Sequence, residues 1–338
     1  MRVAKRRTFR PWGLSALAAV SLLVAGASAG AATQTSFSIT YESGVPADVK
    51  SAFNQATVRW SNLLRDPVTV KITVGWEDLG PQVLGEAEFY VAVGGFDAVR
   101  SLVINGAEVG DAREAALLPN LPTAAGLNLH LPAGFGFKKT GYLTTPNWKA
   151  LGGSYAETDG TIRFSSKFSW DYDPSNGITG GTYDLVGVAT HEIGHFLGFT
   201  SGIDIIDYYM SKGWTDNDVW VSPLDFFRFD TTELGAGFNF TTTARDLTPG
   251  GSQSFYYGDG SVLMSTGAYN GDGSQGSHWK DLLGLGILDP TAAAGELLAI
   301  GQNDLIALDL IGWDVVPEPA TLALVALGGL FILRRRRA

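Results

Sequence analysis

Residues 183–201, YDLVGVATHEIGHFLGFTS, decide how this chain folds. Their apolar residues recur at the spacing of one helix face, over a length typical of a buried helix. Asp184 stands where a carboxylate can cap the start of such a helix, and Gly198 where a glycine can end it with a left-handed turn. We therefore expect a buried helix here, with these residues in the core: Leu185, Val188, Ala189, Ile193, Phe196 and Leu197.

Two histidines of this helix indicate a metal site. His191 and His195 are four residues apart, so their side chains project from the same helix face, one turn above the other. This spacing matches two imidazole ligands of one catalytic Zn²⁺. Glu192 directly follows the first histidine and is placed to take a proton from a water molecule at the metal. The pattern predicts His191 and His195 as metal ligands and Glu192 as the catalytic general base.

The third protein ligand is missing from its usual position. In the extended pattern H-E-x-x-H-x-x-G-x-x-H it is a histidine three residues after the glycine, but here that position holds Ser201. A neutral hydroxyl competes poorly with imidazole or carboxylate for zinc. The residues alone leave several candidates for this ligand: His130, Asp204, Asp207, Glu233 and His278. His130 lies between two leucines, which favours a core or surface role for it.

Three segments together resemble the leishmanolysin-type metzincins, a family of zinc metalloproteases. They are HEIGHFLGFTS at 191–201, GSHWKDLLGLGILDP at 276–290 and LIALDLIGWDV at 305–315. In that family a long insertion separates the third ligand from the first two, and the ligand lies in a Ser-His-Trp context. The resemblance therefore implies that His278 is the third zinc ligand. It also implies a turn below the metal at GILDP and a closing helix at 305–311 that ends at Gly312 and Trp313.

Two departures from the family bear on the site. Leu288 stands in the turn where the family carries a methionine that packs below the metal without binding it, and a leucine of similar volume is tolerated at such positions. The chain has no cysteine, so the disulfides of the family have no counterpart. The resemblance thus covers the site and its architecture, with Gly198 and Leu288 as structural residues near the metal.

Both ends of the chain have the composition of sorting signals. Residues 1–10 carry five basic and no acidic residues, and an apolar run ending in small residues follows, which is typical of a secretory signal peptide over 1–32. Residues 316–338 hold Pro317-Glu318-Pro319, an apolar stretch and four arginines. This tail resembles the PEP-CTERM sorting signal of Gram-negative bacteria, which implies processing by an exosortase-type enzyme. A permanent C-terminal membrane anchor is the alternative.

The chain between these ends is acidic. Five of the 24 basic residues lie in 1–32 and four in the tail, whereas Glu318 alone of the 34 acidic residues lies in either end. Such a surface repels nucleic acid and suits an exported protein. Without cysteine, the protein has neither disulfides nor thiolate metal ligands. We expect a polypeptide substrate, membrane contact only through the unprocessed tail, and a location at the cell surface or in the extracellular matrix.

The order of elements predicts an α+β or α/β N-terminal half, and the family resemblance implies an α+β fold of the metzincin-like zincin type. Helical spacing favours helices, and alternation favours strands; the helices are expected at 46–64 and 98–118, and the strands at 67–76, 87–93 and 160–170. We expect an N-terminal twisted mixed sheet with a backing helix and the active-site helix, followed by a loop-rich C-terminal subdomain. The predicted segments are a signal peptide (1–32), an N-terminal zincin subdomain (33–202), a C-terminal subdomain (203–315) and the sorting tail (316–338).

The sequence thus leads to the expectation of a secreted zinc-dependent endopeptidase that hydrolyses peptide bonds with Glu192 as general base. The alternative is a non-catalytic surface or exopolysaccharide-matrix protein on a zincin fold, which Leu288 favours. Calcium (Ca²⁺) is a weaker expectation. DYDPSNG at 171–177 resembles the start of a calcium loop, but its glycine is one position late and the distal glutamate is missing, which favours a plain turn.

Overall fold

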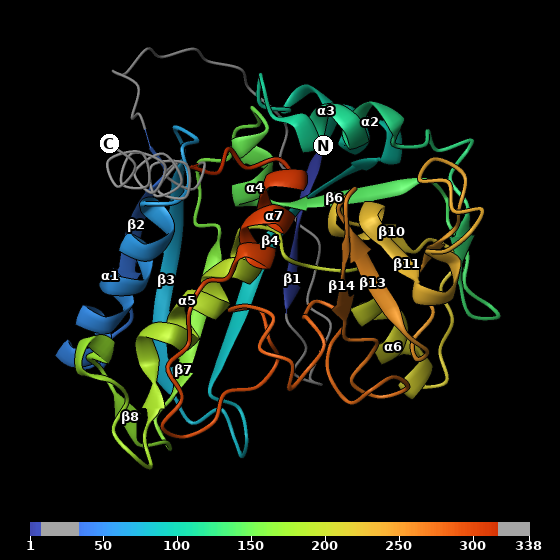
Figure 1. Cartoon of the computed structure of the whole chain (residues 1–338). Coiled ribbons are helices and arrows are strands. Elements are labelled where there is room, and N and C mark those ends of the chain that lie inside the picture. The colour runs from blue at the N-terminus through green and yellow to red at the C-terminus, as the bar shows by residue number, and fades with distance from the viewer. Residues whose placement is uncertain (8–33, 317–338) are drawn as a thin grey trace, which may run out of the picture.

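A mixed β-sheet forms the centre of the protein in a computed structural model that describes residues 1–7 and 34–316, with the backbone alone for residues 2–7 (Figure 1). Seven strands belong to this sheet, in the hydrogen-bonded order β10-β6-β4-β7-β3-β2, with β1 paired to β4. They are β1 (Arg2–Arg7), β2 (Ser36–Tyr41), β3 (Thr69–Glu77), β4 (Gly85–Gly95), β6 (Thr140–Thr144), β7 (Gly160–Ser165) and β10 (Trp220–Val221).

The sheet combines parallel and antiparallel pairs. β2, β3 and β7 are parallel neighbours, and β4 runs antiparallel to β7. In β3 the alternate residues Val70, Ile72 and Val74 are buried, as expected for β-branched residues on the covered face of a strand. The predicted α+β class with a mixed sheet is confirmed.

Strand β4 has different neighbours on its two edges. The Tyr90 N–H donates to the Asp159 carbonyl (2.8 Å) beside β7, and the Phe96 N–H donates to the Lys139 carbonyl (2.7 Å) beside β6. Residues an even number apart direct their backbone groups to the same edge. β7 and β6 therefore follow one another along one edge of β4. β1 pairs antiparallel along the other edge, up to Glu88.

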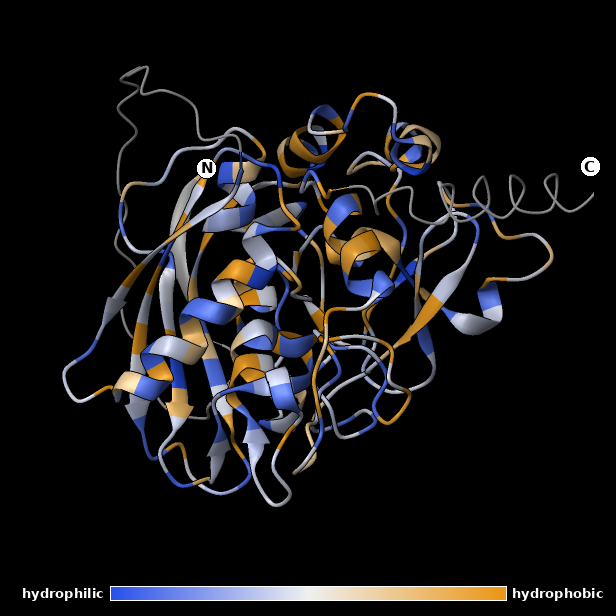
Figure 2. Cartoon of the chain, turned by 60° about the vertical axis from the view of Figure 1, so that its left-hand side comes forward, coloured by the Kyte–Doolittle hydropathy of each residue, from blue (hydrophilic) through white to orange (hydrophobic). Residues whose placement is uncertain are grey.

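Two helices lie side by side against this sheet: α1 (Ala47–Ser61) and α5 (Leu185–Phe196) (Figure 1). Their contact is fixed by Trp60, which is fully buried and donates its indole N–H to the Thr190 carbonyl at 2.9 Å. Figure 2 shows polar and apolar residues alternating along the helices in front of the strands. One face of α1 is covered, whereas every residue of α5 except His191 is buried. Both were expected, the first as the backing helix.

The helix expected at 98–118 is two helices, α2 (Phe96–Asn105) and α3 (Ala112–Leu117). Gly106 ends α2 where a Cβ would lie 2.5 Å from the Leu151 side chain, and Gly110 has φ +101°. The strand expected at 160–170 ends at Ser165, and β8 (Trp170–Asp171) follows after a turn. The short helix α4 (Thr145–Ala150) was not predicted.

The C-terminal half has more regular structure than its composition predicts. α6 (Ile203–Ser211) directly follows the motif, and β11 (Arg228–Asp230), β13 (Gln253–Tyr256) and β14 (Ser261–Met264) form a second sheet. The closing helix is α7 (Gln302–Leu310). The remaining short strands pair in twos: β5 (Leu129–His130) with β12 (Arg245–Asp246), and β8 with β9 (Tyr183–Asp184). β10 carries this half into the main sheet, while the subdomain boundary at 202/203 stays a prediction.

The last described residues lie along the segment that follows α1. Leu64 and Val315 form an antiparallel bridge, the Arg65 N–H donates to the Asp314 carbonyl (2.8 Å), and the Val316 N–H donates to the Leu63 carbonyl (2.8 Å). Ordered pairing therefore continues to the residue before Pro317. Within residues 1–7 and 34–316, no helix is long and apolar enough to cross a membrane.

Candidate metal centre

Helix α5 presents His191, Glu192 and His195 at the centre of the protein. The Asp184 carboxylate caps the helix by accepting the Gly187 N–H at 2.8 Å, as predicted. Gly198 follows the helix with φ +113°, a left-handed conformation that glycine adopts without steric cost. The predicted start and end of the motif helix are both confirmed.

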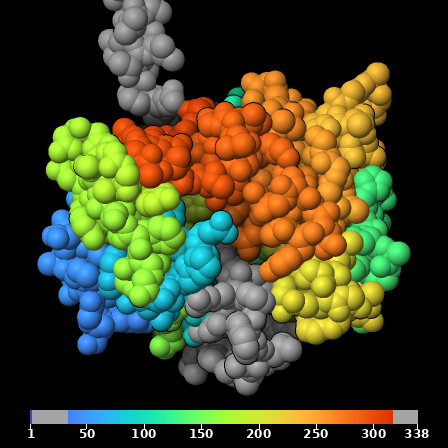
Figure 3. Space-filling view, turned by 90° about the horizontal axis from the view of Figure 1, so that it is seen from below, coloured from blue at the N-terminus to red at the C-terminus, as the bar shows by residue number. Residues whose placement is uncertain are grey.

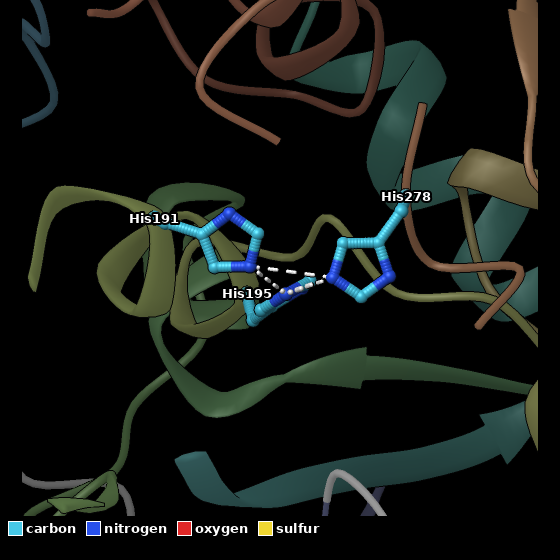
Figure 4. Close-up of side chains that lie close together, drawn as sticks. All are labelled: His191, His195 and His278. Carbon is cyan, nitrogen blue, oxygen red and sulfur yellow. Dashed lines mark hydrogen bonds between the residues drawn. The ribbon is translucent and has the colours of Figure 1, made fainter. Parts of the chain in front are cut away.

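The structure brings a third histidine to this pair (Figure 4). His278 comes from the segment between β14 and α7, 83 residues after His195. The Nε2 atoms of the three rings are 3.1 Å (His191–His195), 3.2 Å (His195–His278) and 3.3 Å (His191–His278) apart. Of the candidates that the sequence left open, His278 is therefore the one that completes a triad.

Backbone carbonyls orient all three rings. The Nδ1 atom of His191 lies 2.7 Å from the Ile287 carbonyl, that of His195 lies 2.9 Å from the Phe199 carbonyl, and that of His278 lies 3.2 Å from the Gln275 carbonyl. A carbonyl only accepts, so each Nδ1 must carry the proton. In the neutral rings the three Nε2 lone pairs then face one another, an arrangement that a bound cation stabilises.

The geometry and charge of the triad fit a metal ion. Zn–N bonds of 2.0–2.1 Å in a tetrahedral site place the nitrogen atoms about 3.3 Å apart, close to the distances between these Nε2 atoms. Burial lowers the pKa of His191 to about 4 and that of His195 to about 3, and lowers the pKa of His278 well below its usual value. All three rings are thus neutral at pH 7, the form that binds metals. The triad could bind a metal, and it is the only group of three or more possible ligands in the described part of the chain.

Glu192 lies between the triad and the start of β4. A Cβ built on Gly85 would lie 3.1 Å from the Glu192 Oε1 atom, so the absence of a side chain at 85 leaves room for this carboxylate. Glu192 is 6% exposed. Burial, and second the nearby Glu86 carboxylate, raise the pKa of Glu192 to about 8. A cation on the triad would favour the ionised form.

The expected turn at GILDP lies against α5. Leu288 is buried, and a Cβ on Gly194 would be 3.0 Å from both of its terminal methyl groups. The neighbouring Ile287 carbonyl is the one that orients His191. Leu288 therefore packs beneath the helix that carries two of the histidines, the structural position expected for it.

Asp304, near the start of α7, holds this turn in place and was not identified from the sequence. Its carboxylate accepts the Trp279 indole N–H (2.7 Å) and the backbone N–H groups of Ile287 (2.7 Å), Leu288 (3.3 Å) and Gly301 (2.7 Å). An acidic residue three positions after Gly301 fits half of a capping box, the only sequence signal for it. The contacts to Trp279 and the turn depend on the tertiary fold.

The other candidate ligands lie outside the triad. Asp204 accepts the Ser277 hydroxyl, and Asp207 accepts the N–H groups of Tyr269 and Asn270 at 2.8 Å each. His130 pairs instead with Glu233 at 3.0 Å. These four residues were reasonable ligands by type, and their contacts assign them to other roles.

The segment considered for calcium is a hydrogen-bonded turn. The Asp171 carboxylate accepts the N–H groups of Asp173 (3.0 Å) and Thr179 (2.9 Å), and Asp173 accepts the Ser175 N–H (3.1 Å). The carboxylate oxygens thus satisfy the backbone of the turn, as the alternative interpretation expected.

A cleft of about 990 Å³ opens over the histidines. Its walls come from the start of β4 on one side and from residues 268–303 on the other. In Figure 3 this hollow lies between the cyan residues at the start of β4 and the orange and red residues of the later segment. The triad and Glu192 line it, so a ligand in the cleft can reach them.

Comparison with known proteins identifies the C-terminal tail. Residues 315–337 match the family model described as the PEP-CTERM protein-sorting motif, which confirms the predicted sorting signal. The protein is therefore exported, processed by an exosortase-type enzyme and sorted to the surface of a Gram-negative bacterium. The structure of the tail and of most of the predicted signal peptide lies outside the described residues. No curated protein and no solved structure matches the chain significantly.

Proposed function

We propose that this protein is a secreted zinc-dependent endopeptidase of the metzincin type, similar to leishmanolysin. The observation that carries the proposal is the convergence of three Nε2 atoms within 3.1–3.3 Å, each ring fixed by a carbonyl on its Nδ1 atom. His191, His195 and His278 would hold zinc, with Glu192 beside them in the same cleft. A structural zinc site usually closes with a fourth protein ligand, whereas three ligands at a cleft leave a position for a reactant.

Zinc, when bound, polarises a carbonyl group and makes water more acidic. Glu192 accepts a proton from the attacking water and passes it to the nitrogen of the leaving amine. A cation on the triad would favour the ionised form of Glu192, which is the form that accepts this proton. The peptide would lie extended beside Gly85, along the edge of β4 that β1 occupies. β1 lies within the predicted signal peptide, so its removal on export would leave this edge open to the peptide.

The proposal is tested on the exported protein by measuring zinc content and the cleavage of casein. Glu192→Gln should keep one zinc per chain and lose activity by about 100-fold or more. His278→Ala should lose zinc affinity as well as activity. His130→Ala is the matched control, because this histidine lies outside the triad, and it should keep both properties.

Two results would contradict the proposal. Full zinc content and activity in His278→Ala would remove this residue from the site. A wild-type protein that binds zinc but cleaves none of a broad set of peptides would favour the non-catalytic surface or matrix role on the same fold.

A further inference from the structure

The third histidine is supported differently from the first two. His191 and His195 lie on a helix, whereas His278 follows a segment with glycines at 271, 273 and 276. Glycine-rich backbone loses the most conformational entropy when it is ordered. The Nδ1 contact of His278 is also the longest of the three, at 3.2 Å. The His278 carbonyl accepts the Ser265 N–H at 3.0 Å, and the rest of its placement depends on contacts made by its neighbours in the chain.

Ser277, directly before His278, makes two such contacts. Its hydroxyl oxygen accepts the Ser201 N–H at 2.9 Å, and its hydroxyl donates to the Asp204 Oδ2 atom. Ser277 is 3% exposed. The Ser277 hydroxyl thus connects the segment before His278 to Ser201, at the end of HEIGHFLGFTS, and to Asp204, in the first turn of α6.

A buried ion pair supports both sides of this connection. Asp225 accepts the Ser201 hydroxyl and, at 2.9 Å, the Gly202 N–H. Arg228 donates to the Gly276 carbonyl and, at 3.1 Å, to the Ser265 carbonyl. Asp225 and Arg228 are fully buried, with 3.9 Å between the Oδ1 and Nε atoms. The Ser201–Gly202 segment and the Gly276 carbonyl directly before Ser277 are therefore both held by this buried ion pair.

We propose that the Ser277–Asp204 hydrogen bond positions His278 and thereby sets the metal affinity of the triad. Asp204 and Ser277 are positioning residues, since neither has an atom in the triad. The inference rests on the proposed metal site, and it also gives position 201 a role. Ser201 supplies no ligand, and its backbone N–H instead holds the residue next to the ligand that arrives from later in the chain.

The test compares variants of the exported protein by zinc competition with a chromophoric chelator and by the visible spectrum of bound Co²⁺. Ser277→Ala and Asp204→Ala should each raise the zinc Kd by about 10–100-fold, the usual effect of removing an outer partner of a metal ligand. The double variant should be no weaker than either single variant, because both changes break the same connection. The Co²⁺ spectrum should change in the same variants.

Two further variants separate positioning from general stability. Asp204→Asn keeps an acceptor for the Ser277 hydroxyl and should stay within about threefold of the wild-type Kd. Thr35→Val removes another buried hydroxyl, one that donates to the Asp66 carbonyl at 2.9 Å. It should lower the unfolding temperature without changing the Kd or the Co²⁺ spectrum.

Four outcomes would count against the positioning role of the Ser277–Asp204 hydrogen bond or against the metal site itself. A wild-type Kd in Ser277→Ala, or additive effects in the double variant, would overturn the positioning role. If Ser277→Ala does not fold, the two Asp204 variants decide, and equal Kd values for them would overturn it. A wild-type protein that binds no zinc would instead refute the proposed function, so the two failures are distinguishable.

Discussion

The hydrogen atom in place of a side chain at position 194 explains why the turn under α5 can carry a leucine. The terminal methyl groups of Leu288 lie where a Cβ at 194 would be in contact at 3.0 Å. Helix and turn therefore meet closely beneath His191 and His195. Glycine is therefore needed at position 194 for steric reasons, which the sequence pattern alone does not reveal.

We expect Gly194→Ala to destabilise the protein by about 1 kcal/mol, although alanine is the better helix former. Helix propensity favours alanine by about 1 kcal/mol, but crowding a packed core costs about 1–3 kcal/mol. Urea unfolding measures the difference. The double variant Gly194→Ala/Leu288→Val should recover stability, because valine frees space at the contact. A more stable single variant would contradict the close packing.

The leucine itself should be compatible with the site. We expect Leu288→Met to change the free energy of unfolding by less than about 1.5 kcal/mol, since the volumes are similar. Leu288→Ala should cost about 2–5 kcal/mol because it leaves a cavity. Unfolding and zinc titration of both variants check this. A large gain in zinc affinity in Leu288→Met would show that leucine impairs the site.

At the scale of the elements, α5 is connected to the cleft through its cap. Besides the Gly187 N–H, the Asp184 carboxylate accepts the Leu298 N–H at 3.2 Å, and Leu298 lines the cleft. The sequence predicted the cap from local spacing. It did not predict the second contact, which joins residues 114 apart.

We expect Asp184→Ala to cost about 1–3 kcal/mol of stability, because it removes a helix cap and leaves a second N–H without its acceptor. Asp173→Ala is the matched control, since that carboxylate caps a short exposed turn, and its effect should stay within about 0.5 kcal/mol. Thermal unfolding compares the two. Equal losses would show that the contact with Leu298 adds nothing.

The same distinction between local and distant information explains which elements could be predicted. α1, β3, β4 and α5 carry their periodicity within a few residues, and they appear where expected. α6 was not predicted, because its nine residues IDIIDYYMS directly follow a glycine and precede a polar region, so the whole segment was expected to be loop. His278 was reached through family resemblance, and Asp225, Arg228 and Asp304 were not reached, because their roles exist only in the folded chain.

At the scale of the whole molecule, buried carboxyl groups gather near the end of the described chain. Burial is the main cause that raises the pKa of three of them, and neighbouring acids add to it: Asp66 to about 7, Glu114 to about 8 and Asp309 to about 7. In the fold these groups keep protons that the unfolded chain loses near pH 4. Their stabilisation is therefore complete below about pH 4 and is lost as the pH rises through 7 to 8.

We expect the metal-free protein to lose about 2–3 kcal/mol of unfolding free energy between pH 6.5 and 8.5. This window lies above the ordinary pKa of histidine, so the buried triad, which has the opposite effect at lower pH, contributes little there. Glu192, whose pKa is about 8 without a metal, adds to the loss. Urea unfolding in the presence of a chelator measures the slope. Glu114→Gln cannot ionise and should reduce it, whereas an unchanged or rising stability would contradict the raised pKa values.

The pairing of Val316 with Leu63 also fixes how far the folded body can travel from its sorting motif. The last hydrogen bond of the described chain falls one residue before Pro317, and the three residues of the motif span at most about 10 Å. Whatever binds the motif therefore keeps the folded body within about 10 Å of it. Until the tail is processed, the folded body therefore stays at the place where the sorting motif is held.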